Sequence, residues 1–154
     1  MQDNYRNICK IARDVAGRTQ ERWAELIGVS VESVRQYESG KTMPSDDVVL
    51  RMAEVSGDQI ICYWHLLNKS RVAASLLPEV KATSLPQAVL QLINRMRLFG
   101  ERHLADRLME IAEDGKIDEL EAGPFSQIMA ELGEIVEAAM TLKFAKGDRD
   151  EDFS

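Results

Sequence analysis

The residues of this chain that could do covalent or metal chemistry are few and far apart. His65 and His103 have no second metal ligand at a useful spacing, although a structural metal site needs about four ligands. Cys9 and Cys62 are distant in sequence and form no Cys-x-x-Cys motif, which favours reduced thiols over a disulfide. The sequence contains no nucleophile–base set, phosphate-binding glycine loop or dinucleotide fingerprint. It therefore predicts a protein that is not an enzyme and that uses no cofactor and no metal.

The informative stretch is residues 19–44, TQERWAELIGVSVESVRQYESGKTMP, which predicts two short helices joined by a tight turn. Thr19 and Ser30 are typical N-cap residues, and Gly28 can end the first helix because glycine tolerates a positive φ. Two helices this short cannot bury both apolar faces against each other, so one helix is presented outward. That geometry is typical of a DNA-reading helix-turn-helix. The expected helices cover residues 20–27 and 31–39.

Further helices are expected on both sides of this pair. Hydrophobic spacing predicts a first helix from Asn4 to Ala16, with an inward side made of Ile8, Ile11, Ala12 and Val15. Ser45 should cap a fourth helix, whose first turn holds the acidic residues that a helix dipole favours. Asp58 is the predicted cap of a fifth helix, which runs to about Asn68.

The remainder of the sequence predicts a domain boundary followed by a second helical region. Residues 69–87 contain small residues and two prolines, although Val72 to Leu77 could extend the fifth helix. Three amphipathic patterns follow, and the longest runs from Phe125 to Met140. The predicted organisation is a DNA-binding domain over 1–70, a linker or helix extension over 71–87, a helical domain over 88–146 and a disordered acidic tail over 147–154.

Composition and charge agree with an all-α protein. Hydrophobic residues make up 45% of the chain but aromatic residues only 6%, and β-branched runs are scarce. The first 75 residues hold ten Lys/Arg and ten Asp/Glu, whereas the rest hold 9 and 16 and so carry the whole net charge of −7. A neutral N-terminal half should bind DNA phosphates only through local basic positions. No apolar run approaches the ~20 residues that span a bilayer, and no signal peptide is evident, so we expect no membrane association and a cytoplasmic protein.

The stretch over residues 19–44 resembles the Cro/repressor-type (Xre-type) helix-turn-helix family of transcription regulators. The similarity extends over about residues 4–67 and rests on the combined pattern of TQERWAELIGVS, SVRQYESGK and MPS followed by an amphipathic helix. It implies a five-helix Cro/repressor-like DNA-binding domain followed by a small helical C-terminal domain. The implied partner is double-stranded DNA.

The resemblance implies contacts to the DNA backbone at both ends of the helix pair. Gln20 opens the second helix, where family members use the glutamine and the first-turn amides to hold a phosphate, and helix N-termini suit anions. Lys41 and Thr42 follow the reading helix, at positions where the family contacts the phosphodiester chain. Arg18 and Arg22 are secondary candidates for phosphate contacts.

The resemblance places the base-reading residues at the start of the third helix, at Val31, Glu32, Ser33 and Gln36. Gln36 can bond bidentately to N6 and N7 of adenine, and Ser33 can contact a base or a phosphate. Val31 replaces the polar residue common at this position, so a thymine methyl is its expected contact. Glu32 and Arg35 have two interpretations, because each could contact a base or remain a solvated surface charge.

Two further positions carry structural expectations. Arg13 and Glu38 match positions that pair as an internal ion bridge in similar repressors, which would tie the first helix to the reading helix. The alternative is that they are two independent surface ions. Trp23 is bulkier than the small aliphatic residue usual at its position.

The C-terminal helices have three possible roles. Helix-turn-helix readers usually need two copies to span half-sites about one DNA turn apart, so we expect a homodimer formed through these helices. A docking surface for an effector protein and a simple helical core are the alternatives.

The leading functional prediction is a sequence-specific transcription regulator, a repressor that binds a two-fold operator as a homodimer. The alternative is a protein-interaction module, antitoxin-like or an anti-regulator, that keeps the helix-turn-helix fold. In that case the acidic half binds a partner protein. The acidic C-terminal half and the weakly basic N-terminal half favour this alternative.

Overall fold

The computed structural model describes residues 2–146 of the 154-residue chain and the side chains of residues 8–146. The tail predicted over residues 147–154 lies outside this range. The described residues are all-α apart from one isolated backbone bridge between Ser84 and Lys146. They divide into two compact units, one ending at Leu77 and the other beginning at Pro78. The predicted fold class is confirmed, with a helix-turn-helix part and a separate C-terminal helical part.

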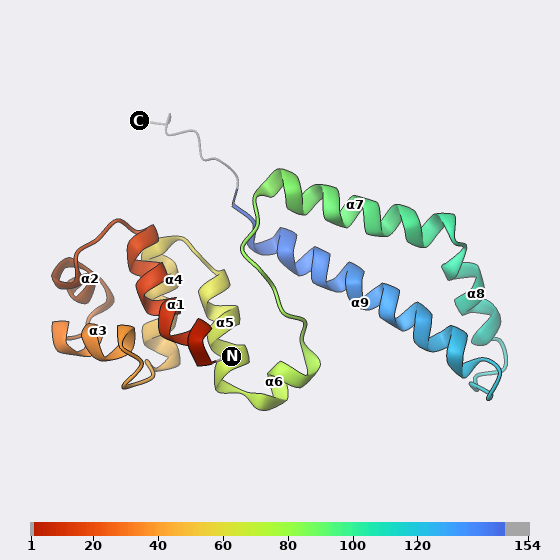
Figure 1. The fold of residues 1–154 in the computed structure, drawn as a ribbon, viewed down its shortest axis with the longest axis horizontal. Helices are drawn as coiled ribbons and strands as arrows, with labels where there is room; N and C mark the ends of the chain where they lie inside the picture. Colours follow the sequence, from red (N-terminus) through yellow and green to blue (C-terminus); the bar gives the residue numbers. More distant parts are fainter. Residues whose placement is uncertain (1, 147–154) are drawn as a thin grey trace. The chain divides into compact units, whose positions relative to one another are not determined.

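The first unit packs its helices around one small core. α1 contacts α3, α4 and α5, while α2 contacts α3 and α4 (Figure 1). The largest side chains buried at the centre include Trp23, Ile27, Met52 and Ile61. The helices of this unit are α1 (Gln2–Val15), α2 (Gln20–Ile27), α3 (Val31–Glu38), α4 (Asp46–Ser56), α5 (Ile60–Lys69) and α6 (Arg71–Leu76).

Local hydrogen bonds fix the limits of the α2–α3 pair. Thr19 Oγ1 accepts a hydrogen bond from the Arg22 N–H at 3.2 Å, and Ser30 Oγ accepts one from the Ser33 N–H at 3.0 Å. Each such cap stabilises a helix by about 1 kcal/mol. Gly28 ends α2 with a φ of 70°, in the left-handed region where a Cβ would add strain. The predicted helices and caps are confirmed, except that α3 ends one residue earlier than expected.

The buried side of α1 differs from the prediction. Ile11 and Val15 were expected in the core but are 37% and 48% exposed, whereas Cys9 is buried. The helix is rotated because Arg13 reaches toward α3, and positions 9 and 13 share a side at 100° per residue. Burial, together with the nearby charge of Glu38, raises the pKa of the Cys9 thiol to about 12.

The segments on either side of α5 also correct the prediction. The expected cap at Asp58 is wrong, because α5 begins at Ile60 with Gln59 in the cap position, and Asp58 is itself buried. The predicted extension of α5 is instead a separate short helix, α6. Ser70 turns the backbone out of α5, and its hydroxyl accepts a hydrogen bond from the Ala73 N–H at 3.1 Å.

A charged cluster joins the start of α4 to α5. Asp46 Oδ1 accepts a hydrogen bond from Lys69 Nζ at 2.7 Å and lies 2.9 Å from Nε2 of His65. The contact with Lys69 and then that with His65 hold the pKa of Asp46 below its ordinary value. Sequence reasoning missed this cluster, although His65 and Lys69 are four residues apart and therefore share one side of a helix. The cluster borders a surface hollow of about 710 Å³ between α4, α5 and α6.

Replacing Asp46 with asparagine should remove a pH-dependent part of the stability of the first unit. Because the pKa of folded Asp46 is lowered, its ionised form favours folding at pH values above its ordinary pKa of 3.8. This contribution is lost as the pH falls through the lowered folded pKa. The difference in free energy of unfolding between the wild type and Asp46→Asn should therefore be present near neutral pH and shrink in acid.

Urea unfolding followed by tryptophan fluorescence measures this difference in the first unit alone, because both tryptophans, Trp23 and Trp64, lie there. Asp47→Asn is the matched control, since Asp47 occupies the same first turn of α4. A difference for Asp46→Asn that stays constant from neutral to acidic pH would show that the cluster does not act through the carboxylate charge.

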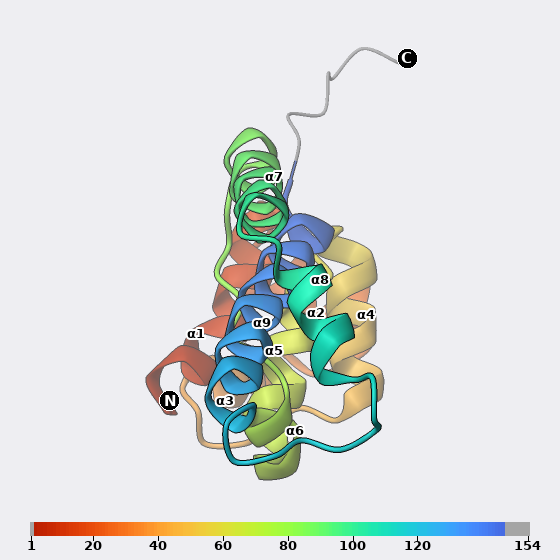
Figure 2. The same ribbon diagram turned by 90° about the vertical axis from the view of Figure 1, so that its right-hand side faces the viewer.

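The second unit is a helical hairpin with a short connecting helix. It consists of α7 (Leu85–Glu101), α8 (Leu104–Ile111) and α9 (Ala122–Phe144). α7 and α9 lie antiparallel and side by side, and α8 contacts both (Figures 1 and 2). Arg95 on α7 pairs with Glu134 on α9, and Arg102 Nη1 lies 2.7 Å from Glu131 Oε1.

Three residues of types that usually interrupt helices instead lie at the starts of these two. Pro86 lies in the first turn of α7, and Gly123 and Pro124 lie in the first turn of α9. Proline is compatible with a first turn because the N–H that it lacks would have no partner within the helix. The prolines therefore set where these helices start.

Candidate nucleic-acid interface

α3 presents most of its length to the surface. Within this helix, which is described in full, only Val34 is buried. Glu32 and Arg35 are exposed, and their carboxylate and guanidinium lie 3.9 Å apart. An exposed pair of this kind contributes less than about 1 kcal/mol to stability, so both groups remain available to another partner.

Gln36 is held by its neighbours in a way that leaves part of its amide available. Thr42 Oγ1 donates to Gln36 Oε1 at 2.9 Å, and Gln36 Nε2 donates to Glu32 Oε1 at 3.4 Å. A carboxamide has two N–H donors and two acceptor lone pairs, so one of each stays free. That remaining pair is what the N7 and N6 atoms of adenine require.

The loop after α3 and the first turn of α3 complete this surface. The Lys41 N–H donates to the Gln36 carbonyl at 3.0 Å, which fixes the chain as it leaves the helix. Ser33 Oγ lies 2.8 Å from Ser30 Oγ, so the cap and the predicted base-reading hydroxyl are coupled. Val31 and Ser33 are partly exposed, whereas Lys41 and Thr42 are exposed. Seven of the residues predicted to contact DNA therefore lie within α3 and the loop directly after it: Val31, Glu32, Ser33, Arg35, Gln36, Lys41 and Thr42.

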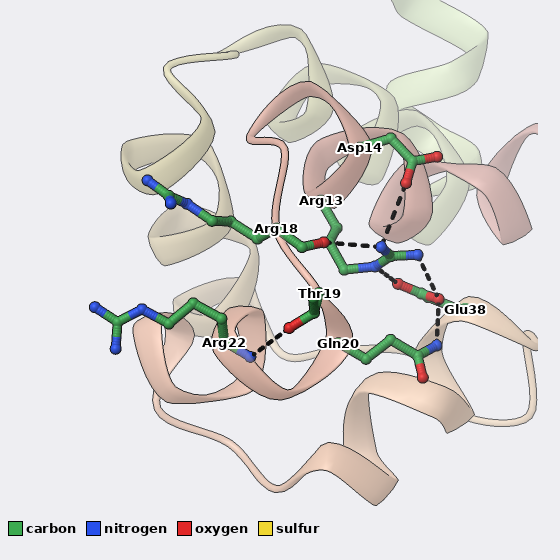
Figure 3. Close-up of polar contacts among 7 residues, drawn as sticks. All are labelled: Arg13, Asp14, Arg18, Thr19, Gln20, Arg22 and Glu38. Atoms are coloured by element: carbon green, nitrogen blue, oxygen red, sulfur yellow. Dashed lines mark hydrogen bonds and ion pairs between the residues drawn. The ribbon is translucent and has the colours of Figure 1, made fainter.

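One carboxylate connects three helices behind this surface. Glu38, the last residue of α3, accepts hydrogen bonds from Arg13 Nε at 2.6 Å, Arg13 Nη2 at 3.3 Å and Gln20 Nε2 at 2.8 Å (Figure 3). Arg13 Nη1 also donates to the Arg18 carbonyl at 2.9 Å. The structure thus places Arg13 and Glu38 in direct contact and adds Gln20 to the pair.

The bridge is largely removed from water. The Arg13 and Glu38 side chains are 15% and 9% exposed. The hydrogen bond with Glu38, and then the charge of Glu38, raise the pKa of Arg13 above its ordinary value, against the opposing effect of burial. Because it links α1 and the start of α2 to the end of α3, this bridge fixes the orientation of α3.

The protein-family comparison matches these same elements. A family model described as "Helix-turn-helix" matches residues 10–57, from the second half of α1 through α4. Residues 10–57 are a Cro/repressor-type (Xre-type) helix-turn-helix domain. Such a domain binds DNA, and it is typical of regulators that are not enzymes. No curated protein and no solved structure is a significant match to this chain.

The residues of the Xre-type domain that are predicted to contact phosphates near the start of α2 differ in their surroundings: Gln20 bonds to Glu38, whereas the two arginines point away from the bridge. Gln20 directs one N–H toward Glu38, so its second N–H and the backbone amides at the start of α2 remain for a phosphate. The side chains of Arg18 and Arg22 point away from the Arg13–Glu38 bridge (Figure 3). Arg22 Nη1 lies 2.6 Å from Glu25 Oε2 in an exposed pair.

Trp23 fills the centre of the Xre-type domain and leaves one polar atom without a partner. Its side chain is fully buried, and among the described residues its Nε1 has no hydrogen-bond acceptor. A buried donor without a partner costs about 1–3 kcal/mol, which the burial of a large aromatic side chain can offset. The domain therefore accommodates this bulky residue as part of its core.

Other kinds of site find no support in residues 2–146. This part of the chain contains no group of three or more His, Cys, Asp or Glu side chains placed to bind a metal ion. Within the same residues, no helix combines the length and the apolar composition needed to cross a membrane.

Proposed function

We propose that this protein is a sequence-specific DNA-binding transcription regulator, a repressor that binds a two-fold operator as a homodimer. The observation that most supports this function is the outward polar side of α3, with Gln36 oriented by Thr42 and half of its amide free. In an Xre-type domain this side enters the major groove.

The proposal assigns residues to two kinds of contact. Val31, Glu32, Ser33, Arg35 and Gln36 face the base edges, where Gln36 pairs with adenine and Val31 contacts a thymine methyl. The backbone contacts position the domain and carry no sequence information. They come from Gln20, Lys41 and Thr42, with Arg18 and Arg22 as secondary contributors.

The two halves of the chain have different tasks in this proposal. Residues 1–70 bind DNA, and residues 88–146 join two copies. With equal numbers of acidic and basic residues in the first 75 positions, the DNA-binding half has little general attraction for DNA. Two linked copies compensate, because the second half-site is then bound at a high effective concentration.

Selection of genomic DNA fragments with the purified full chain tests the proposal. We expect enrichment of a two-fold motif with half-sites about 10 base pairs apart, or a multiple of that spacing. Selection at two salt concentrations should recover the same motif, with weaker binding at the higher one. Failure to enrich any motif at either salt concentration would rule out sequence-specific binding.

A second candidate function is supported by the acidic second unit. Here the chain is an antitoxin-like or anti-regulator module, and the acidic helices bind an effector protein. The net charge of −7 carried by residues 76–154 favours such a contact with a basic partner. This alternative predicts that no DNA motif is enriched but that a basic protein forms a stoichiometric complex with the second unit.

A further inference from the structure

The hollow between α4, α5 and α6 lies apart from the surface proposed to bind DNA. It has a volume of about 710 Å³, and none of its lining residues comes from α2 or α3, which are both described in full. Small-molecule sites in proteins typically measure about 300–1,000 Å³. The hollow therefore has the size of a ligand site, and its occupation does not compete with DNA for the same side chains.

Much of the lining of this hollow is apolar. It comes from three helices and includes Val49, Leu50, Leu66 and Val72. The last three are 53%, 45% and 69% exposed, so a ligand that covers them removes apolar surface from water. That removal favours binding roughly in proportion to the area covered. A fitting ligand therefore has an apolar body.

Charged side chains line the same hollow. Lys69 and Arg71 carry two positive charges against the one negative charge of Asp46, which leaves a net charge of +1 when His65 is neutral. Asp46 is already partnered, because its Oδ1 lies 2.7 Å from Lys69 Nζ and 2.9 Å from His65 Nε2. The Lys69 ammonium has three N–H donors and uses one of them in this contact. The hollow therefore offers more free donors than an uncharged or cationic ligand could use.

Arg71 is the cation of this hollow that lacks a counter-ion. Its side chain is exposed, and among the described residues its guanidinium forms no ion pair. A guanidinium presents paired N–H groups that match a carboxylate bidentately. The net charge of +1 equals the charge of one carboxylate, whereas a phosphate monoester carries about −1.5 to −2 at pH 7. Charge complementarity therefore favours a single carboxylate as the polar group of the ligand.

We propose that this hollow binds a small aliphatic monocarboxylate. The apolar chain of the ligand covers Leu50, Leu66 and Val72, and its carboxylate bonds to Arg71 with a further donor from Lys69. The inference goes beyond the proposed function and does not depend on it, because no residue of the hollow is assigned a DNA contact.

Protection of Cys62 tests whether such a ligand enters the hollow. Cys62 lines it and is partly exposed, whereas Cys9 is only 1% exposed. Burial raises the pKa of the Cys62 thiol, so its alkylation by iodoacetamide is measured at alkaline pH. Octanoate, kept below its micelle-forming concentration, should slow this reaction several-fold in the full chain. Cys9 should stay unreactive, which verifies that the domain remains folded. An unchanged rate at Cys62 would overturn the proposal.

Two probes with the same chain length test the charge of the ligand. Octylammonium is positively charged and octan-1-ol is uncharged, so both should protect Cys62 less than octanoate does at equal concentration. Equal or stronger protection by octylammonium would overturn the proposal, because the free donors would then not select an anion. Equal protection by octan-1-ol would also overturn it, since apolar contact alone would hold the ligand.

The variant Arg71→Gln tests the bond to the carboxylate. Titration calorimetry with octanoate should show an affinity about tenfold below that of the wild type, because a hydrogen bond to a charged group is lost. Arg51→Gln is the matched control, since Arg51 is an exposed arginine of α4 that does not line the hollow. It should bind octanoate as the wild type does. An Arg71→Gln variant with wild-type affinity would overturn the assignment of Arg71.

DNA selection with the wild type separates this inference from the proposed function. Protection of Cys62 by octanoate without any enriched DNA motif supports the ligand site and rules out the sequence-specific regulator. An enriched motif without protection of Cys62 overturns the ligand site and leaves the regulator function intact.

Discussion

Replacing Glu38 with alanine should lower the free energy of unfolding of the first unit by about 3 kcal/mol. The substitution removes the acceptor of three hydrogen bonds, two from Arg13 and one from Gln20. The Arg13 guanidinium then stays largely buried, with the Arg18 carbonyl and a 3.4 Å contact to Asp14 as its remaining partners. Removing one partner of a buried ion pair typically costs 3–5 kcal/mol, and these remaining contacts place the expected loss at about the lower limit.

Urea unfolding monitored by tryptophan fluorescence measures this loss. The matched control is Glu25→Ala, which removes the same kind of carboxylate from an exposed pair with Arg22. Because those side chains are 67% and 59% exposed, the control should cost only about 0.2–1 kcal/mol. Glu38→Gln should be intermediate, since it keeps an acceptor for Arg13 but loses the charge. Equal losses for the Glu38 and Glu25 alanine variants would show that the bridge does not stabilise the domain.

Replacing Gln36 with alanine should weaken binding to the best operator by about 1–3 kcal/mol and relax the preference at one base pair. The amide offers one free N–H and one free lone pair, while Thr42 and Glu32 occupy the others. Removing it leaves the adenine edge without its bidentate partner, so all four bases at that position become more nearly equal. Binding to a set of single-base operator variants gives the size of the effect and its position.

Two further variants show how specific this effect is. Thr42→Val removes the hydroxyl that orients the amide and should reproduce part of the loss at the same base pair. Gln59→Ala is the matched glutamine control, because Gln59 precedes α5 and lies outside the α2–α3 pair. It should leave the base preference unchanged. If Gln36→Ala binds every operator variant as the wild type does, Gln36 does not read a base.

The helix-turn-helix was predictable because its signals are local. Thr19 and Ser30 cap helices through hydrogen bonds to N–H groups three residues away, and Gly28 ends a helix through its own backbone freedom. The combined spacing also carried the family resemblance. None of these features requires knowledge of what the helices pack against.

The errors arose where packing decided the outcome. Ile11 and Val15 are apolar at helical spacing, yet α1 is rotated so that Arg13 can reach Glu38, 25 residues away in sequence. Asp58 has the residue type of a cap, but it lies buried while α5 begins two residues later. The cluster of Asp46, His65 and Lys69 also escaped prediction.

By itself, the sequence determined the α2–α3 pair with its caps and the Xre-type domain, because turn chemistry and hydrophobic spacing act within a few residues. Only the tertiary structure decided that Gln20 joins the Arg13–Glu38 bridge and that Thr42 orients the Gln36 amide. These contacts join side chains from different elements, and their geometry depends on how the helices are rotated and packed. Residue spacing along the chain does not encode that rotation.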